Sequence, residues 1–141
     1  MSTESSDKKN SEAPSVLEAI AQGPRGKVLA VQRRDANGDK FFPVVQELEE
    51  IGKTRPGEIQ GIKDLFRRFA VEGRSGLTRE QLHHANKEED IWRIRKGRTR
   101  VYGYFEGNNL VLSGAALKKA QEADLRQVKA AAALRALLKN R

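Results

Sequence analysis

The stretch IWRIRKGRTRVYGYF, residues 91–105, predicts a β-hairpin around which the rest of the fold can be arranged. Its strands run from Ile91 to Arg95 and from Arg100 to Phe105, and the turn KGRT joins them. Side chains alternate across a sheet, so the apolar side chains Trp92, Ile94, Val101 and Phe105 share one face, which suits a core covered by helices. The opposite face collects Arg93, Arg95, Arg100, Tyr102 and Tyr104.

The segments that follow the hairpin predict one more strand and a long helix. The strand NLVLS, residues 109–113, lies beyond the turn EGNN. The alanine- and leucine-rich segment from Ala115 to Lys139 carries apolar side chains at helical spacing. Lys118 and Lys119 then fall at the start of this helix, where they can border the basic face.

The segments before the hairpin predict one strand and two helices. KVLAVQ, residues 27–32, is a short apolar strand. Asn37-Gly38 between apolar runs is compatible with a hairpin turn, but Pro43 and the spacing of Val44, Leu48 and Ile51 favour a helix from Asp39 or Phe41 to Ile51. A second helix covers residues 54–73. Thr78, with Gln81 three residues later, caps a short turn over residues 79–86.

The predicted fold class is therefore α+β, with a small antiparallel or mixed sheet. The expected order is a strand, two helices, a three-stranded meander and a C-terminal helix. Residues 1–24 are expected to form an N-terminal extension, disordered over the polar residues 1–13 and weakly helical in the amphipathic piece SVLEAIAQ, residues 15–22. Residues 25–141 are expected to form the domain.

The charge of the chain is concentrated in its last third. The 141 residues carry a formal net charge of +8, but residues 1–90 have 15 Lys/Arg against 16 Asp/Glu, whereas residues 91–141 have 12 against 3. Such a local excess attracts polyanions, and nucleic acid or ribosomal RNA is favoured over the alternatives of a solubilising surface or an acidic protein partner. The absence of cysteine excludes disulfides and thiolate metal sites. No apolar run is long enough to span a bilayer and no signal-peptide core is present, so a cytoplasmic protein is expected.

The residue types on the basic face suit RNA. Arginine binds phosphate bidentately, and a tyrosine ring offers a surface for an unpaired base. The competing interpretation is an ordinary solvated sheet face. His83 and His84 are the only histidines; either could move protons near neutral pH, and His84 is the candidate. No ligand spacing for a metal, no phosphate-binding glycine loop and no dinucleotide fingerprint is present, so no cofactor and no metal are expected.

Residues 90–120, DIWRIRKGRTRVYGYFEGNNLVLSGAALKKA, resemble the RelE/HigB superfamily of bacterial toxins, especially its phage-derived HigB-like branch. The likeness rests on Trp92, Ile94 and Arg95, on the alternating pattern from Arg100 to Tyr104, and on the lysine pair. It extends over roughly residues 27–138 through the order of elements. The chain departs from the pattern at Arg93, at SGAAL in place of an aromatic and histidine-bearing stretch, and at AQEADLR.

The resemblance implies a RelE-like fold and a toxin of a type II toxin–antitoxin system that cleaves mRNA on the ribosome. The implied partners are mRNA, the ribosome and a cognate antitoxin. The candidate catalytic residues are Arg95, Arg100, Tyr102 and His84, and the candidate RNA-binding residues are Arg93, Arg98, Tyr104, Lys118 and Lys119. The alternatives are a non-catalytic protein of this fold that binds nucleic acid or a host protein, and an assembly protein that docks on an acidic partner.

Overall fold

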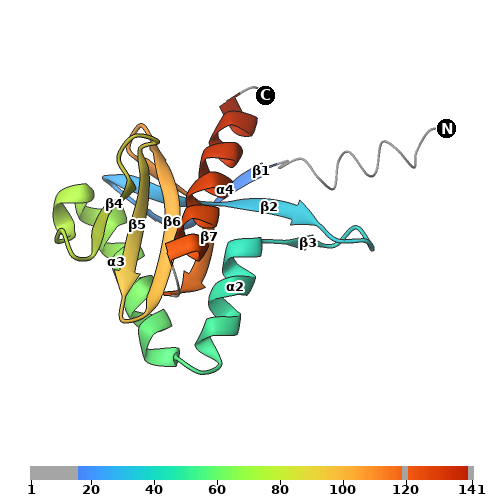
Figure 1. The fold of residues 1–141 in the computed structure, drawn as a ribbon, viewed down its shortest axis with the longest axis horizontal. Coiled ribbons are helices and arrows are strands. Elements are labelled where there is room, and N and C mark those ends of the chain that lie inside the picture. The colour runs from blue at the N-terminus through green and yellow to red at the C-terminus, as the bar shows by residue number, and fades with distance from the viewer. Residues whose placement is uncertain (1–15, 119–120, 140–141) are drawn as a thin grey trace.

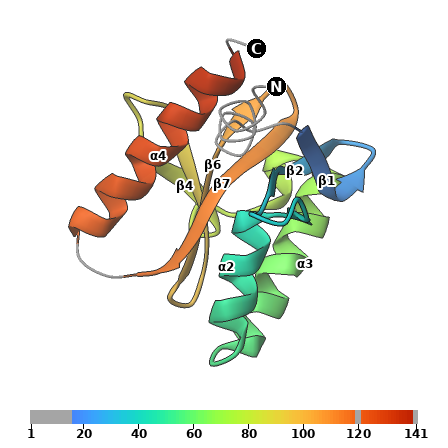
Figure 2. The ribbon, with the colours of Figure 1, turned by 90° about the vertical axis from the view of Figure 1, so that its right-hand side faces the viewer.

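A mixed β-sheet lies between two helical layers in the computed structural model, which describes residues 16–118 and 121–139. One helix covers one face of the sheet, and two helices cover the other (Figure 2). The chain is therefore an α+β protein, as predicted. The disorder expected for residues 1–13 lies outside the described residues.

The sheet has one parallel strand pair near its middle and antiparallel pairs elsewhere (Figure 1). Its spatial order is β1-β2-β7-β6-β5-β4, and the short strand β3 pairs with β2. The parallel pair is β2 with β7, and the intervening chain supplies the helices α2 and α3 and the strands β4, β5 and β6. The strands are β1 (Val16–Gly23), β2 (Gly26–Arg34), β3 (Lys40–Phe41), β4 (Leu82–Asn86), β5 (Ile91–Lys96), β6 (Thr99–Glu106) and β7 (Asn109–Leu117).

Proline and glycine set the limits of the first two helices. Helix α2 (Pro43–Gly52) and helix α3 (Pro56–Glu72) both begin with proline, whose fixed φ suits the first helical position. Gly73 ends α3 with φ of +80°, a backbone conformation that glycine adopts without a steric cost. A 3₁₀ turn (Arg74–Gly76) follows. Both helices predicted from the sequence over this region are confirmed, with slightly shorter bounds.

The two helical layers enclose two separate hydrophobic clusters. The larger lies under α2 and α3 and includes Phe69, Ile94 and Val101, each no more than 1% exposed. The smaller lies under helix α4 (Gln121–Lys139) and joins Ile91, Tyr104 and Val111 to Val128 and Ala131 of that helix. Buried apolar area of this kind is the main force that holds helices on a sheet. The second cluster therefore holds α4 on the basic, aromatic face of the hairpin, which the sequence analysis assigned to RNA binding.

Residues 16–23 form strand β1, where the sequence analysis expected a weakly helical piece in an N-terminal extension. A two-residue turn, Pro24-Arg25, lets them pair with β2 from Gly23↔Gly26 to Val16↔Gln32. This pairing brings Leu17 against the cluster under α4. Pairing with a distant core thus overrides the local helical pattern, and residues 16–23 belong to the sheet.

Three further segments differ from the prediction in detail. Residues 82–86 form strand β4, which pairs with β5, instead of part of a turn, although Thr78 and Gln81 do form the predicted reciprocal cap. Ala115 and Ala116 belong to β7, because they pair with Val101 and Arg100, so α4 begins at residue 121 and not at residue 115. The Asn37-Gly38 turn also exists: β2 and β3 pair around it before α2 begins.

Candidate functional site at the basic end of the sheet

Arginines from two paired strands gather where β5 turns into β6, at the lower end of the sheet in Figure 1. Arg93 lies opposite Tyr102, and Arg95 lies directly opposite Arg100. Ile94 and Val101 pack into the cluster on the other face. The predicted division of the hairpin into an apolar face and a basic, aromatic face is therefore confirmed. We call the group Arg93, Arg95, Arg98, Arg100 and Lys118 the basic end.

Helix α4 covers the aromatic part of this face. Tyr102 is 4% exposed and Tyr104 is 3% exposed. The Tyr104 ring packs in the cluster with α4, and the Arg135 guanidinium carbon lies 5.9 Å from its centroid. The open stacking surface expected for the two tyrosines is thus absent here, because their rings are occupied by the protein's own helix.

The carboxylate of Asp124, near the start of α4, links the helix to the basic end. It accepts a hydrogen bond from Arg93 Nη1 at 2.7 Å and one from the Tyr102 hydroxyl at 2.5 Å. Burial, and then this hydrogen bond, raise the pKa of Tyr102 to about 12. The phenol therefore stays protonated and donates at neutral pH. This ion pair also explains why Arg93 is half-buried.

His83, not His84, is the histidine of the basic end. Arg93 Nε and Nη2 lie 3.1 and 2.9 Å from His83 Nε2. A guanidinium only donates, so Nε2 accepts, and Nδ1 carries the proton that is donated to the Arg79 carbonyl at 3.1 Å. Burial, and then the charge of Arg93, lower the pKa of His83. The imidazole is therefore neutral at physiological pH.

His84 lies on the opposite face of the sheet. Its ring stacks on Trp92, with centroids 3.9 Å apart, and its Nε2 pairs with Asp90 Oδ1 at 2.9 Å. Asp90 also accepts from the Trp92 indole N–H. The candidate acid or base thus sits with the half-buried tryptophan and away from Arg95 and Arg100. In β4, His83 pairs with Arg93 and His84 pairs with Trp92. If the sequence analysis had identified β4 as a strand, side-chain alternation would have placed His83 on the basic face and His84 on the other.

Arg100 is a buried cation at the centre of the site. Its side chain is 6% exposed and donates to the carbonyls of Gly97 and Thr99 at 2.7 and 3.2 Å. Within the described part of the chain no carboxylate forms an ion pair with it. Burial, and then the charges of Arg95 and Arg93, lower the pKa of Arg100. Like charges directly opposite on paired strands are destabilising, so the Arg95–Arg100 pair is a place where a bound anion would stabilise the protein.

The remaining cations of the site are held at its rim. Arg98 Nη2 donates to the Lys118 carbonyl at 2.8 Å, and the Lys118 N–H donates to the Arg98 carbonyl at 2.7 Å. Lys118 therefore follows β7 at the mouth of the turn and does not begin a helix. Lys119 lies outside the described residues. The exposed side chains of Arg95, Arg98 and Lys118 are the part of the basic end that a ligand can reach directly.

A carboxylate from α3 holds the β5–β6 turn in place. Glu58 accepts from the Arg98 N–H at 3.1 Å and from the Thr99 hydroxyl at 2.9 Å, and it pairs with Arg55 at 3.0 Å. Burial alone would raise the pKa of Glu58, but these hydrogen bonds and the Arg55 charge lower it overall. Gly97 in the same turn has φ of +59°, and a β-carbon there would lie 2.2 Å from Glu58 Oε2. The contacts with Glu58 therefore hold the β5–β6 turn in one conformation without a bound ligand.

The site has the chemistry of an anion-binding surface. Among the described residues, no cluster of three or more His, Asp or Glu side chains could hold a metal ion. The described helices include none that is long and apolar enough to cross a membrane.

Comparison with protein-family models gave no match, and comparison with curated proteins gave no significant match.

Proposed function

We propose that this protein binds RNA through the basic end of its sheet and, as a RelE/HigB-like toxin, acts on mRNA at the ribosome in the cytoplasm. The observation that carries the proposal is the convergence of Arg95, Arg98, Arg100 and Lys118 at one turn, with Arg95 directly opposite the buried Arg100. Guanidinium groups bind phosphate oxygens through paired hydrogen bonds, and each phosphate contact releases counterions.

The resemblance adds a possible reaction to this binding. In mRNA cleavage by this class of toxin, a 2′-hydroxyl attacks the adjacent phosphate, and cations stabilise the charge that develops on its oxygens. In this proposal the exposed Arg95 holds that phosphate, and the buried Arg100 opposite it adds its positive charge. Arg98 and Lys118 contact flanking phosphates, and a cognate antitoxin is the partner. His83 is the imidazole that contacts Arg93 on this face, and in this proposal it replaces His84 as the candidate for proton transfer.

A second candidate function is binding without cleavage, and a specific observation favours it. Both proton-transfer groups beside the arginines are engaged: His83 Nε2 accepts from Arg93, and the Tyr102 hydroxyl donates to Asp124. A general base must have a free lone pair within reach of the proton that it removes. This geometry supports phosphate binding more directly than it supports cleavage, so a non-catalytic protein that binds nucleic acid or a host protein is the rival.

The first experiment measures binding of the full chain to a single-stranded RNA and to ribosomes across a range of salt concentrations. Arg95→Ala should weaken binding by roughly 1–3 kcal/mol and reduce the slope of log K against log salt by about 0.7. Arg68→Ala removes an exposed arginine from α3 and should change neither quantity. Equal affinity of the Arg95 variant and the parent would contradict the proposal.

A second experiment separates cleavage from binding. Primer extension on mRNA after brief expression, with and without ribosomes, should show cuts that disappear in the Arg95→Ala variant. If the parent binds RNA with the expected salt dependence but leaves no cuts in either condition, the non-catalytic function holds. If the parent does leave cuts, His83→Ala should reduce them and His84→Ala should not, because only His83 lies on the basic face.

A further inference from the structure

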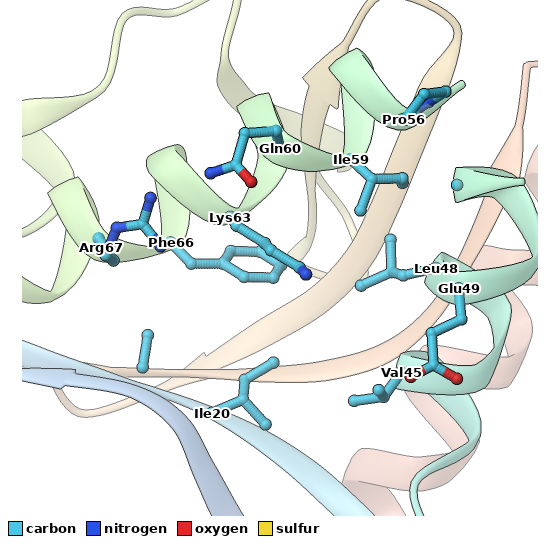
Figure 3. Close-up of a pocket in the computed structure, with 12 residues that line it drawn as sticks. Ile20, Val45, Leu48, Glu49, Pro56, Ile59, Gln60, Lys63, Phe66 and Arg67 are labelled. Atoms are coloured by element: carbon cyan, nitrogen blue, oxygen red, sulfur yellow. The ribbon is translucent and has the colours of Figure 1, made fainter. Parts of the chain in front are cut away.

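An apolar groove lies beside the edge strand β1, between the sheet and helices α2 and α3 (Figure 3). It is on the face of the sheet opposite the basic end. Its volume is about 510 Å³, and it opens to solvent between β1, α2 and α3. Its apolar lining consists of Ile20, Ala21, Val45, Leu48, Ile59 and Phe66. It is separated from the β5–β6 hairpin by strands β2 and β7, so it is a different surface from the proposed RNA site.

A β-bulge sends two consecutive apolar side chains of β1 into this groove. The pairing with β2 runs from Ala19↔Leu29 directly to Ala21↔Val28 and skips Ile20. An extra residue in one strand breaks the alternation of side chains, so Ile20 and Ala21 both line the groove. Ile20 nevertheless stays 37% exposed, so a partner can reach it from solvent. Bulges frequently aim a side chain at a functional site.

The polar groups of the groove are confined to its rim. Gln60, Lys63 and Arg67 of α3 border one side, and Glu49 of α2 borders the other (Figure 3). All four side chains are exposed, and Arg67 pairs with Asp64 of its own helix. A small-molecule site needs polar groups that converge on the ligand from within. An apolar floor between exposed charges instead suits the apolar face of a polypeptide.

We propose that the groove binds an amphipathic helix of a partner protein, with acidic side chains on the flank that faces Lys63. This inference goes beyond the proposed RNA function and does not depend on it. The bulge interrupts the hydrogen-bonding pattern of β1, so regular addition of another strand along this edge is disfavoured and a helix is the better occupant.

Other occupants available to this chain fit less well. A second copy related by a two-fold axis would present the same concave surface, and two concave surfaces leave a void between them. Residues 1–15 include Met1 as their single large apolar side chain, so this segment lacks the apolar face that the groove requires. A foreign helix with apolar residues at helical spacing supplies both the convex shape and the apolar surface.

The test uses the full chain and a designed helical peptide of about 15 residues, long enough to hold a helix when bound. The peptide carries leucines along one face and glutamates on one flank. A second peptide has lysines in place of the glutamates, and a third is a scrambled sequence of the first. We expect the acidic peptide to bind more tightly than the other two and to shift the NMR signals of the Ile20, Val45 and Ile59 methyl groups.

Three variants make the result specific. Ile20→Asp should weaken binding of the acidic peptide at least tenfold, whereas Val71→Asp, at an exposed valine of α3 outside the groove, should leave it unchanged. Lys63→Glu should weaken the acidic peptide and strengthen the basic one. Melting temperatures close to that of the parent show that the variants are folded.

Several results would overturn the proposal. One is equal binding of the acidic and scrambled peptides; another is binding that Ile20→Asp does not weaken. Sedimentation that shows a dimer of the parent and a monomer of the Ile20→Asp variant would assign the groove to a second copy of the chain instead. RNA binding by the same variants is expected to be unchanged, so failure of this proposal and failure of the RNA proposal are distinguishable.

Discussion

Replacing Asp124 by alanine should loosen helix α4 from the sheet. The carboxylate accepts hydrogen bonds from Arg93 and Tyr102 and is the described side chain that connects the start of α4 to β5 and β6. The variant leaves the Tyr102 hydroxyl, in a residue that is 4% exposed, without this acceptor. It also leaves the Arg93 guanidinium without its ion pair.

The expected loss of stability follows from the burial of each partner. A buried hydroxyl that loses its hydrogen-bond partner lowers the free energy of unfolding by about 1–3 kcal/mol. The ion pair contributes less, about 0.5–1 kcal/mol, because the side chains of Arg93 and Asp124 are 24% and 27% exposed and water screens them. The total is about 1.5–4 kcal/mol. For a domain of this size that corresponds to a decrease in melting temperature of roughly 10 °C.

Thermal melts followed by circular dichroism measure the decrease, and amide hydrogen exchange localises it. Exchange should accelerate in α4 more than in β2 and β7, because the lost contacts join α4 to the sheet. Asp64→Ala is the matched control: it removes an exposed carboxylate that pairs with Arg67 on the surface of α3, and its effect should stay within about 0.5 kcal/mol. A melting temperature of Asp124→Ala within 1–2 °C of the parent, or uniform acceleration of exchange, would refute the reasoning.

Three other changes test the structure away from this contact. Because the pKa of Tyr102 is raised, its protonated hydroxyl contributes to the stability of the folded state. This contribution is fully present below the ordinary tyrosine pKa of 10 and is lost as the pH rises through about 12. Tyr102→Phe should remove this alkaline loss in thermal melts between pH 9 and 12. The lowered pKa of Glu58 predicts the opposite pH dependence. Its ionised carboxylate stabilises the folded state above the ordinary pKa of 4.5, and this stabilisation is lost as the pH falls. Glu58→Gln should abolish this dependence when unfolding is followed in acid. Gly103→Ala should destabilise the sheet by several kcal/mol in urea unfolding, because its β-carbon would lie 2.2 Å from the Val111 carbonyl oxygen; full stability of this variant would show that β6 and β7 are farther apart than described.

The basic end shows where sequence reasoning succeeds and where it stops. Alternation along residues 91–105 correctly placed Arg93, Arg95, Arg100, Tyr102 and Tyr104 on one face, because the period of a strand is a local property of the backbone. The same reasoning could not show that α4 returns across that face and buries both tyrosines. An apolar stripe on a helix indicates that the helix is covered, but it does not identify the surface that covers it.

The histidines show the same limit at a single strand. Whether His83 or His84 joins the arginines depends on β4 being a strand and on its register with β5. The segment LHHAN has no regular alternation of apolar and polar residues, so nothing local identified it. Pairing with β5, which sets His83 opposite Arg93, and contact with the arginines decided the outcome.

The sequence alone determined the α+β class, helices α2 and α3, the hairpin β5–β6 and the accumulation of positive charge in the last third of the chain. These follow from proline and glycine positions, side-chain periodicity and composition, all of which act within a few residues. Only the tertiary structure decided that residues 16–23 are a strand, that Asp124 and His83 complete the basic end, and that a groove stays open beside Ile20. Each of these depends on which other segments lie beside the residues in space, and a pattern within one segment does not record its neighbours.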